Sequence, residues 1–221
     1  MKSQQLRLPS EEECIQILHD SGAHDLFINH SRRVQGVARA VCSIAKRRGI
    51  HVDADLVSVA ALLHDVVKHS ARGNHGKEGG DYLRSRGLPH IAEVVETHCP
   101  ENLRTDKLVP KTVEQKIIFY ADLRVNPGRI VTLDKRFAYI RECYPRAESI
   151  ISEIYTFAKQ VEWELLGDMH ELVLLHVEQP LVSKEQAKTR PADEIKEEIL
   201  DNEITEIAHS VHNQQNRRKA A

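Results

Sequence analysis

The sequence has few aromatic residues and no long apolar run. Phenylalanine, tyrosine and tryptophan make up 5% of its 221 residues, and there is a single tryptophan. No apolar stretch approaches the roughly 20 residues that a membrane-spanning helix needs. The opening segment MKSQQLRLPSEEE also lacks the apolar run of a signal peptide. We therefore expect a protein without a membrane partner.

Cysteine is scarce as well. The four cysteines, Cys14, Cys42, Cys99 and Cys143, lie far apart and form no CxxC pair. Scattered thiols of this kind, without a secretion signal, are typical of proteins that work in a reducing compartment. The sequence therefore predicts reduced thiols and a cytoplasmic location.

Charge of either sign is not in excess. The chain has 31 basic and 33 acidic residues, with a formal net charge of -2 at pH 7. Nonspecific binding to nucleic acid depends on a large positive field, which this balance does not provide. We therefore expect that nucleic acid is not the main partner.

Apolar residues, by contrast, recur at three- and four-residue steps, which is typical of amphipathic helices. No strand-like alternation and no internal repeat interrupts this pattern. The sequence therefore predicts an all-α fold. Helices are expected between Ser10 and Gly22, from about 25 to 48, from Asp53 to about Val67, from Gly76 to near Gly87, from Pro89 to His98, from Thr112 past Asp122, and around 133–143 and 147–166.

The composition changes along the chain and suggests three parts. Residues 1–24 are expected to form an N-terminal helix, and residues 25–180 the principal domain. Residues 181–221 are polar and highly charged, with apolar residues at near-heptad spacing at Leu200, Ile204, Ile207 and Val211. We interpret them as a helical extension and as a candidate contact for a homo-oligomer.

Histidine and aspartate residues fall on the buried sides of several expected helices. His30 lies four residues before Val34 on an apolar stripe, and Asp122 lies four residues after Ile118. His64 and Asp65 are adjacent near the end of a helix. Neutral imidazole and carboxylate together suit zinc, manganese, iron and similar ions. Adjacent residues project about 100° apart on a helix, so this pair favours a site built from several helices.

These residues resemble the motif of the HD-domain phosphohydrolases, which is H, then HD, then a distant D. The matching segments are NHSRRV, AALLHDVVK and FYADLRV. His75 in GNHGKEGGDYL and His98 in ETHCPEN are similar to the extra histidines of the two-metal members. A Pro127-Gly128-Arg129 segment after Asp122 resembles the PGR of bacterial HD-type dinucleoside-tetraphosphate hydrolases, with a spacing one residue longer.

The resemblance implies an HD-domain helical bundle, with additional C-terminal helices, that holds one or two divalent transition-metal ions (Fe, Mn, Zn, Ni or Co). The implied metal ligands are His30, His64, Asp65, His75, His98 and Asp122, with Asp65 between the two ions. It also implies hydrolysis of a phosphate ester or anhydride in a small nucleotide-like substrate by a metal-activated hydroxide.

Cationic side chains near these ligands are candidates for binding the substrate phosphate. We expect Asp65 and Lys68 to take part in catalysis, and Lys68, Arg72, Arg124 and Arg129 to bind the substrate. Lys68 could instead neutralise a helix C-terminus, and Arg129 could hold its own loop. Cys99 is interpreted as a small buried residue rather than as a soft ligand.

Two other functions are compatible with the same ligand pattern. One is a di-iron HD-type oxygenase that cleaves its substrate with O₂. The other is a nucleotide-binding sensor module with little turnover.

Overall fold

The computed structural model describes residues 7–104, 108–126 and 129–173. The predicted extension 181–221 and its oligomer contact lie outside these ranges, as do Pro127 and Gly128. None of the described helices combines the length and the apolar character that crossing a membrane requires.

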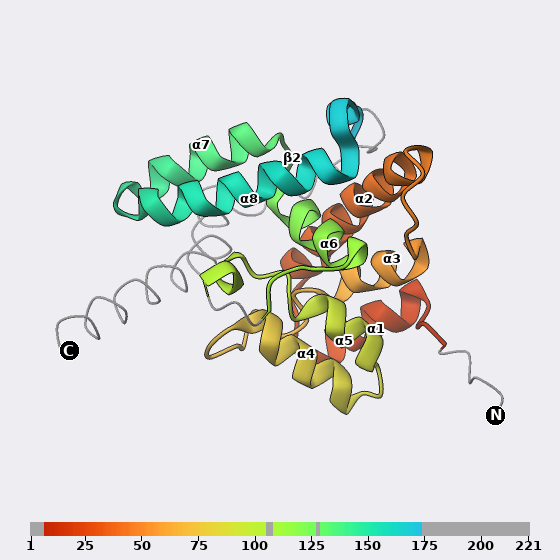
Figure 1. Ribbon diagram of the computed structural model, residues 1–221. Helices are drawn as coiled ribbons and strands as arrows, with labels where there is room; N and C mark the ends of the chain where they lie inside the picture. Colours follow the sequence, from red (N-terminus) through yellow and green to blue (C-terminus); the bar gives the residue numbers. More distant parts are fainter. Residues whose placement is uncertain (1–6, 105–107, 127–128, 174–221) are drawn as a thin grey trace, which may run out of the picture.

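Helices make up most of the described chain (Figure 1). They are α1 (Glu11–Ser21), α2 (Asp25–Arg47), α3 (Ala54–Leu63), α4 (His75–Ser85), α5 (Pro89–Val95), α6 (Val113–Leu123), α7 (Leu133–Cys143) and α8 (Glu148–Leu166). Short 3-10 segments cover Pro100–Arg104, Pro145–Ala147 and Gly167–Met169. Strand within the described ranges is limited to an antiparallel hairpin of β1 (Val125–Asn126) and β2 (Arg129–Ile130). The prediction of an all-α fold is confirmed.

Side-chain caps fix where several helices begin. Ser10 accepts a hydrogen bond from the backbone N–H of Glu13, whose carboxylate accepts one from the Ser10 N–H, and this capping box starts α1. Asp53 caps α3, and Asn74 caps α4 directly before His75. The cap of α4 therefore fixes the position of His75, the candidate ligand with which that helix begins.

The centre of the fold is formed by α2, α3 and α6, which pack against one another. The apolar faces of these helices are buried, and each such side chain contributes about 1.5–3 kcal/mol relative to an exposed one. On one side α4 packs against α5, and on the other α7 and α8 lie side by side (Figure 1). The candidate ligands lie where these layers meet.

One predicted boundary is wrong in a way that matters for the site. The apolar series Leu63 and Val67 suggested that α3 continues past the HD pair, but the helix ends at Leu63. The chain then runs through turns closed by hydrogen bonds from Val66 N–H to Leu63 O and from Lys68 N–H to Asp65 O. Because the helix has ended, neighbouring His64 and Asp65 can both turn inward.

Candidate metal centre

Four buried side chains from three parts of the chain form one group of donors. His30 comes from α2, His64 and Asp65 follow α3, and Asp122 comes from α6. His30 Nε2 lies 2.9 Å from Asp122 Oδ1 and 3.6 Å from Asp65 Oδ2. His64 Nε2 lies 3.3 Å from Asp65 Oδ2 and 3.5 Å from Asp122 Oδ1. Residues 92 positions apart in sequence thus share one cluster.

A second group of donors adjoins the first through Asp65. His75 is the first residue of α4, and His98 follows α5. Their Nε2 atoms lie 3.0 Å apart, and they are 3.3 Å and 3.4 Å from Asp65 Oδ1. Asp65 therefore presents Oδ2 to the first group and Oδ1 to the second. The structure brings together all six side chains that the sequence suggested as ligands.

Backbone carbonyls fix the tautomer of two of the histidines. His64 Nδ1 lies 2.8 Å from Ala61 O, and His98 Nδ1 lies 2.6 Å from Val95 O. A carbonyl only accepts hydrogen bonds, so Nδ1 carries the proton in both rings. In the neutral imidazole, Nε2 then has a lone pair directed into the cluster, as in many metal-binding histidines.

Two atoms in the cluster are close to partners without bonding to them. Among the described residues, His64 Nε2 and Asp65 Oδ1 are buried and form no hydrogen bond, although oxygen and nitrogen atoms lie within 3.5 Å. Leaving such atoms unsatisfied costs about 1–3 kcal/mol each. The distances are short although no hydrogen bond forms, and His64 Nε2 faces the first group of donors while Asp65 Oδ1 faces the second. This is the arrangement that a metal ion would satisfy.

The charges of the cluster also call for a cation. Burial by itself raises the pKa of Asp65, but the attraction of His64 and Lys68 holds this pKa well below its usual range. The pKa of Asp122 is held down in the same way by His30 and His64. Burial lowers the pKa of His64, yet the two carboxylates outweigh it and raise this pKa to about 10. Lys68 offsets one of the two buried negative charges, so a further positive charge is needed, which either a proton on a histidine or a divalent ion supplies.

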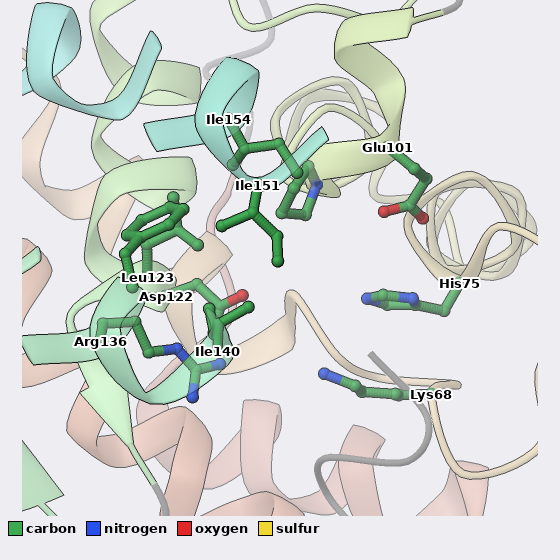
Figure 2. Close-up of a pocket in the computed structure, with 11 residues that line it drawn as sticks. Lys68, His75, Glu101, Asp122, Leu123, Arg136, Ile140, Ile151 and Ile154 are labelled. Carbon is green, nitrogen blue, oxygen red and sulfur yellow. The ribbon is translucent and has the colours of Figure 1, made fainter. Parts of the chain in front are cut away.

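A small cavity opens onto this cluster. Its walls include Lys68 and His75 on one side and Asp122 and Arg136 on the other (Figure 2). The rest of its lining is Glu101 together with the largely apolar side chains of Pro100, Leu123, Phe137, Ile140, Ile151 and Ile154. The volume that it offers to water is about 40 Å³. Lys68 Nζ lies 3.1 Å from Asp65 Oδ2, so an ammonium group lies at the edge of the donor cluster.

The arginines suggested by the sequence lie elsewhere. Arg72 is exposed, and its backbone N–H bonds to Glu78. Arg129 is exposed on β2. Arg124 is buried, but its guanidinium bonds to Val131 O and to the hydroxyl of Tyr120. None of the three lines the cavity.

The arginine that does line the cavity is Arg136, which the sequence reasoning missed. It is buried on α7 and donates from Nη1 to Asn126 Oδ1 at 2.9 Å. A signal was present, because Arg136 interrupts the apolar stripe that Leu133, Phe137 and Ile140 form along α7. A charged residue on a buried stripe needs partners, and here the stripe faces the site.

The comparison with protein families agrees with this geometry. Residues 27–125 match the family described as the HD domain. This part of the chain is an HD domain. All six candidate ligands lie within it, and the capacity of such domains to bind divalent metals fits the donor clusters of the structure. The expected membership in the HD superfamily is thereby confirmed.

Curated relatives resemble only part of this chain. A tRNA (cytidine(56)-2'-O)-methyltransferase of Thermoplasma volcanium is 33% identical over 127 residues, which are 52% of this chain and 36% of that protein. The enzyme of the same name from Picrophilus torridus is 30% identical over 57% of this chain and 39% of its own length. The chain thus spans well under half of either methyltransferase. No solved structure matches the chain.

A third relative is an uncharacterised protein of Methanocaldococcus jannaschii, which is 26% identical over 56% of this chain and 79% of its own length. None of these three relatives is named as a dinucleoside-tetraphosphate hydrolase. The resemblance to that group therefore stays a prediction.

These names correct one expectation. From the net charge we predicted that nucleic acid is not the main partner, whereas two relatives are named for acting on tRNA. The prediction is wrong because it treated the net charge of a whole chain as a measure of its local fields. A near-neutral chain can still carry a surface that binds a polyanion.

Proposed function

We propose that this HD domain is a metal-dependent phosphohydrolase that cleaves a phosphate ester or anhydride of a nucleotide. The proposed ligands of one ion are His30, His64, Asp65 and Asp122, and those of a second ion are His75, His98 and Asp65. Iron, manganese, zinc, nickel and cobalt all accept such ligands. The observation that carries the proposal is the buried Asp65, with one oxygen facing each histidine group.

The side chains around the cavity would act together with the ions. When bound, divalent ions of this kind would polarise a phosphoryl oxygen and lower the pKa of a water molecule to roughly 7. Lys68 holds its ammonium group at the cavity edge, where it can neutralise charge that develops on a phosphate oxygen. Arg136 on the opposite wall offers a planar guanidinium that suits bidentate binding of a phosphate (Figure 2).

The apolar part of the cavity suits the nonpolar surface of a nucleoside. Phe137, Ile140, Ile151 and Ile154 come from α7 and α8 and lie beside the two cations. A volume of about 40 Å³ holds a few water molecules, since one needs about 10–15 Å³ on this measure. A whole nucleotide therefore requires these side chains to move apart when it binds.

The carrier of the phosphate is either a free nucleotide or RNA. The methyltransferase relatives are named for acting on tRNA, which supports an RNA partner for this chain as well. Both carriers present the same phosphate to the metal centre, so the cavity chemistry does not depend on the choice. The substrates in the test must therefore include both.

The test is a hydrolysis screen of the metal-loaded protein, under air and without oxygen, that measures both released phosphate and nucleotide products. Substrates are mononucleotides, dinucleoside polyphosphates and terminally phosphorylated tRNA. Turnover without oxygen is expected and would exclude an oxygenase, whereas saturable binding without turnover in any metal would contradict the proposal and favour a sensor.

The same assay tests Lys68 through a matched pair of variants. Lys68→Met should retain its metal but lower kcat by about a hundredfold, as expected for loss of a preorganised charge. Lys77→Met is the control, because Lys77 is exposed on α4 and pairs with Asp81. Equal kcat values for the two variants would show that Lys68 does not contact the reacting phosphate.

A further inference from the structure

A cysteine sulfur lies against the second histidine pair. Cys99 is fully buried, and its Sγ is 3.4 Å from His75 Nε2 and 3.8 Å from His98 Nε2. The donor atoms of His75, His98 and Cys99 lie within 4.8 Å of one another, close enough to hold one ion together. The histidine pair has a further neighbour in Asp65 Oδ1, which is buried and forms no hydrogen bond within the described chain.

The backbone next to His75 is shaped to receive this sulfur. The N–H of Gly76 donates to Cys99 Sγ at 3.2 Å. A Cβ added at Gly76 would lie 2.7 Å from the sulfur, closer than real contacts allow. Gly76 is the second residue of the eleven-residue helix α4, whose N-terminus favours a negative charge. The absence of a Cβ at Gly76 therefore leaves room for the sulfur beside the histidine pair.

We propose that Cys99 is a ligand of the second ion, so that this ion is held by two imidazoles, one thiolate and the shared carboxylate of Asp65. The inference rests on the two-ion centre of the proposed function. On binding, the Cys99 thiol releases its proton to solvent and the sulfur lone pair forms the bond to the metal.

The distances among the donor atoms of His75, His98 and Asp65, and from the sulfur to the two nitrogens, agree with a tetrahedral site. Zinc bonds of about 2.0–2.1 Å to nitrogen or oxygen and about 2.3 Å to sulfur place the donors roughly 3.3 Å apart, or roughly 3.6 Å where sulfur is one of the pair. The nitrogen pair of His75 and His98 is 3.0 Å apart, and both nitrogens are 3.3–3.4 Å from Asp65 Oδ1. The sulfur is 3.4 Å and 3.8 Å from the same nitrogens.

A thiolate changes which metal the site prefers. Sulfur ligands favour zinc and cobalt, whereas manganese and magnesium prefer oxygen-rich sites. The second site is therefore selective for zinc over manganese, while the first site, with only imidazole and carboxylate donors, is more permissive. Loss of the thiolate should weaken zinc at the second site by at least about tenfold, the scale on which even an outer-shell partner acts.

The test replaces the bound metal in the full chain with cobalt(II) and measures its absorption spectrum. A thiolate ligand produces an intense charge-transfer band in the near ultraviolet, which imidazole and carboxylate do not. The wild type is expected to develop this band as cobalt fills the second site. Cys99→Ser should lose it, and Gly76→Ala should weaken it by displacing the sulfur. Cys143→Ser is the control and should keep it, because Cys143 is exposed on α7.

Two results would overturn the proposal. In the first, the wild type binds two cobalt ions without developing the band. This result would reject Cys99 as a ligand and leave the proposed centre of histidine and aspartate residues in place. The other is a band that persists in Cys99→Ser. If that variant does not fold, X-ray absorption of the zinc-loaded wild type decides, because a sulfur neighbour at about 2.3 Å is then expected. A shell of nitrogen and oxygen alone would reject the assignment.

Discussion

Replacing Arg124 with methionine should lower the free energy of unfolding by about 3–5 kcal/mol, the range for breaking a buried ion pair by removing one partner. The side chain of Arg124 is 1% exposed. Its guanidinium donates to Val131 O and to the hydroxyl of Tyr120. Tyr120 donates to Glu162 at 2.8 Å, and Glu162 Oε1 lies 3.7 Å from Arg124 Nη1. The change therefore breaks a network that joins α6, α8 and the hairpin.

The size of the loss depends on the interactions that the partners of Arg124 retain in the variant. Methionine is long enough to fill much of the space, so the loss is mainly of hydrogen bonds and charge. Glu162 keeps an ion pair with Lys159, whose Nζ lies 2.5 Å from its Oε2. This remaining cation places the expected loss near about 3 kcal/mol. The free energy of unfolding of a domain is about 5–15 kcal/mol, so the change removes a large fraction of its stability.

Urea denaturation measures this loss, with metal content as a second readout. Arg129→Met is the control for stability, because Arg129 is exposed and its loss should change the free energy by no more than about 0.5 kcal/mol. The double variant with Arg124→Met and Glu162→Gln should lose less free energy of unfolding than the sum of the losses in the two single variants. An unchanged urea midpoint with a raised KM would refute this reasoning and would indicate that Arg124 binds the substrate.

Two further outcomes are expected. Asp65→Ala should lose most of the bound metal, since both ions share this carboxylate, and elemental analysis showing wild-type content would reject the shared ligand. In the native protein iodoacetamide should modify Cys143 well before Cys14 and Cys42, because burial raises the pKa of both of these thiols to about 12. Peptide mass mapping that finds all three modified at one rate would contradict this.

The sequence carried enough information to predict that His30 and Asp122 face the interior, because both lie on a local apolar pattern. The apolar stripes of α2 and α6 turned His30 and Asp122 inward, and the two side chains meet although they are far apart in sequence. Caps such as Ser10 with Glu13 fixed helix starts in the same local way. What could be predicted was therefore which side of each helix is buried.

Partners of long cationic side chains could not be predicted in this way. Arg124 lies two residues after Asp122, which suggested a substrate role, but its guanidinium turns to Val131 O and Tyr120. Arg136 lies on α7, for which the sequence predicts a helix and no site residue, yet it lines the cavity. A flexible side chain reaches several neighbours, so the tertiary arrangement of α7 and α8 selects its partner.

Burial by itself does not distinguish charged residues that stabilise the fold from those that form the candidate site. Arg124 and Glu162 are as buried as Asp65, but their network closes on itself through Tyr120. In the candidate metal centre the donor atoms crowd within hydrogen-bonding range, and yet His64 Nε2 and Asp65 Oδ1 bond to nothing in the described chain. A protein tolerates that cost only where something else meets it. The proposal of an ion site therefore rests on these two crowded donor atoms that form no hydrogen bond, and not on burial alone.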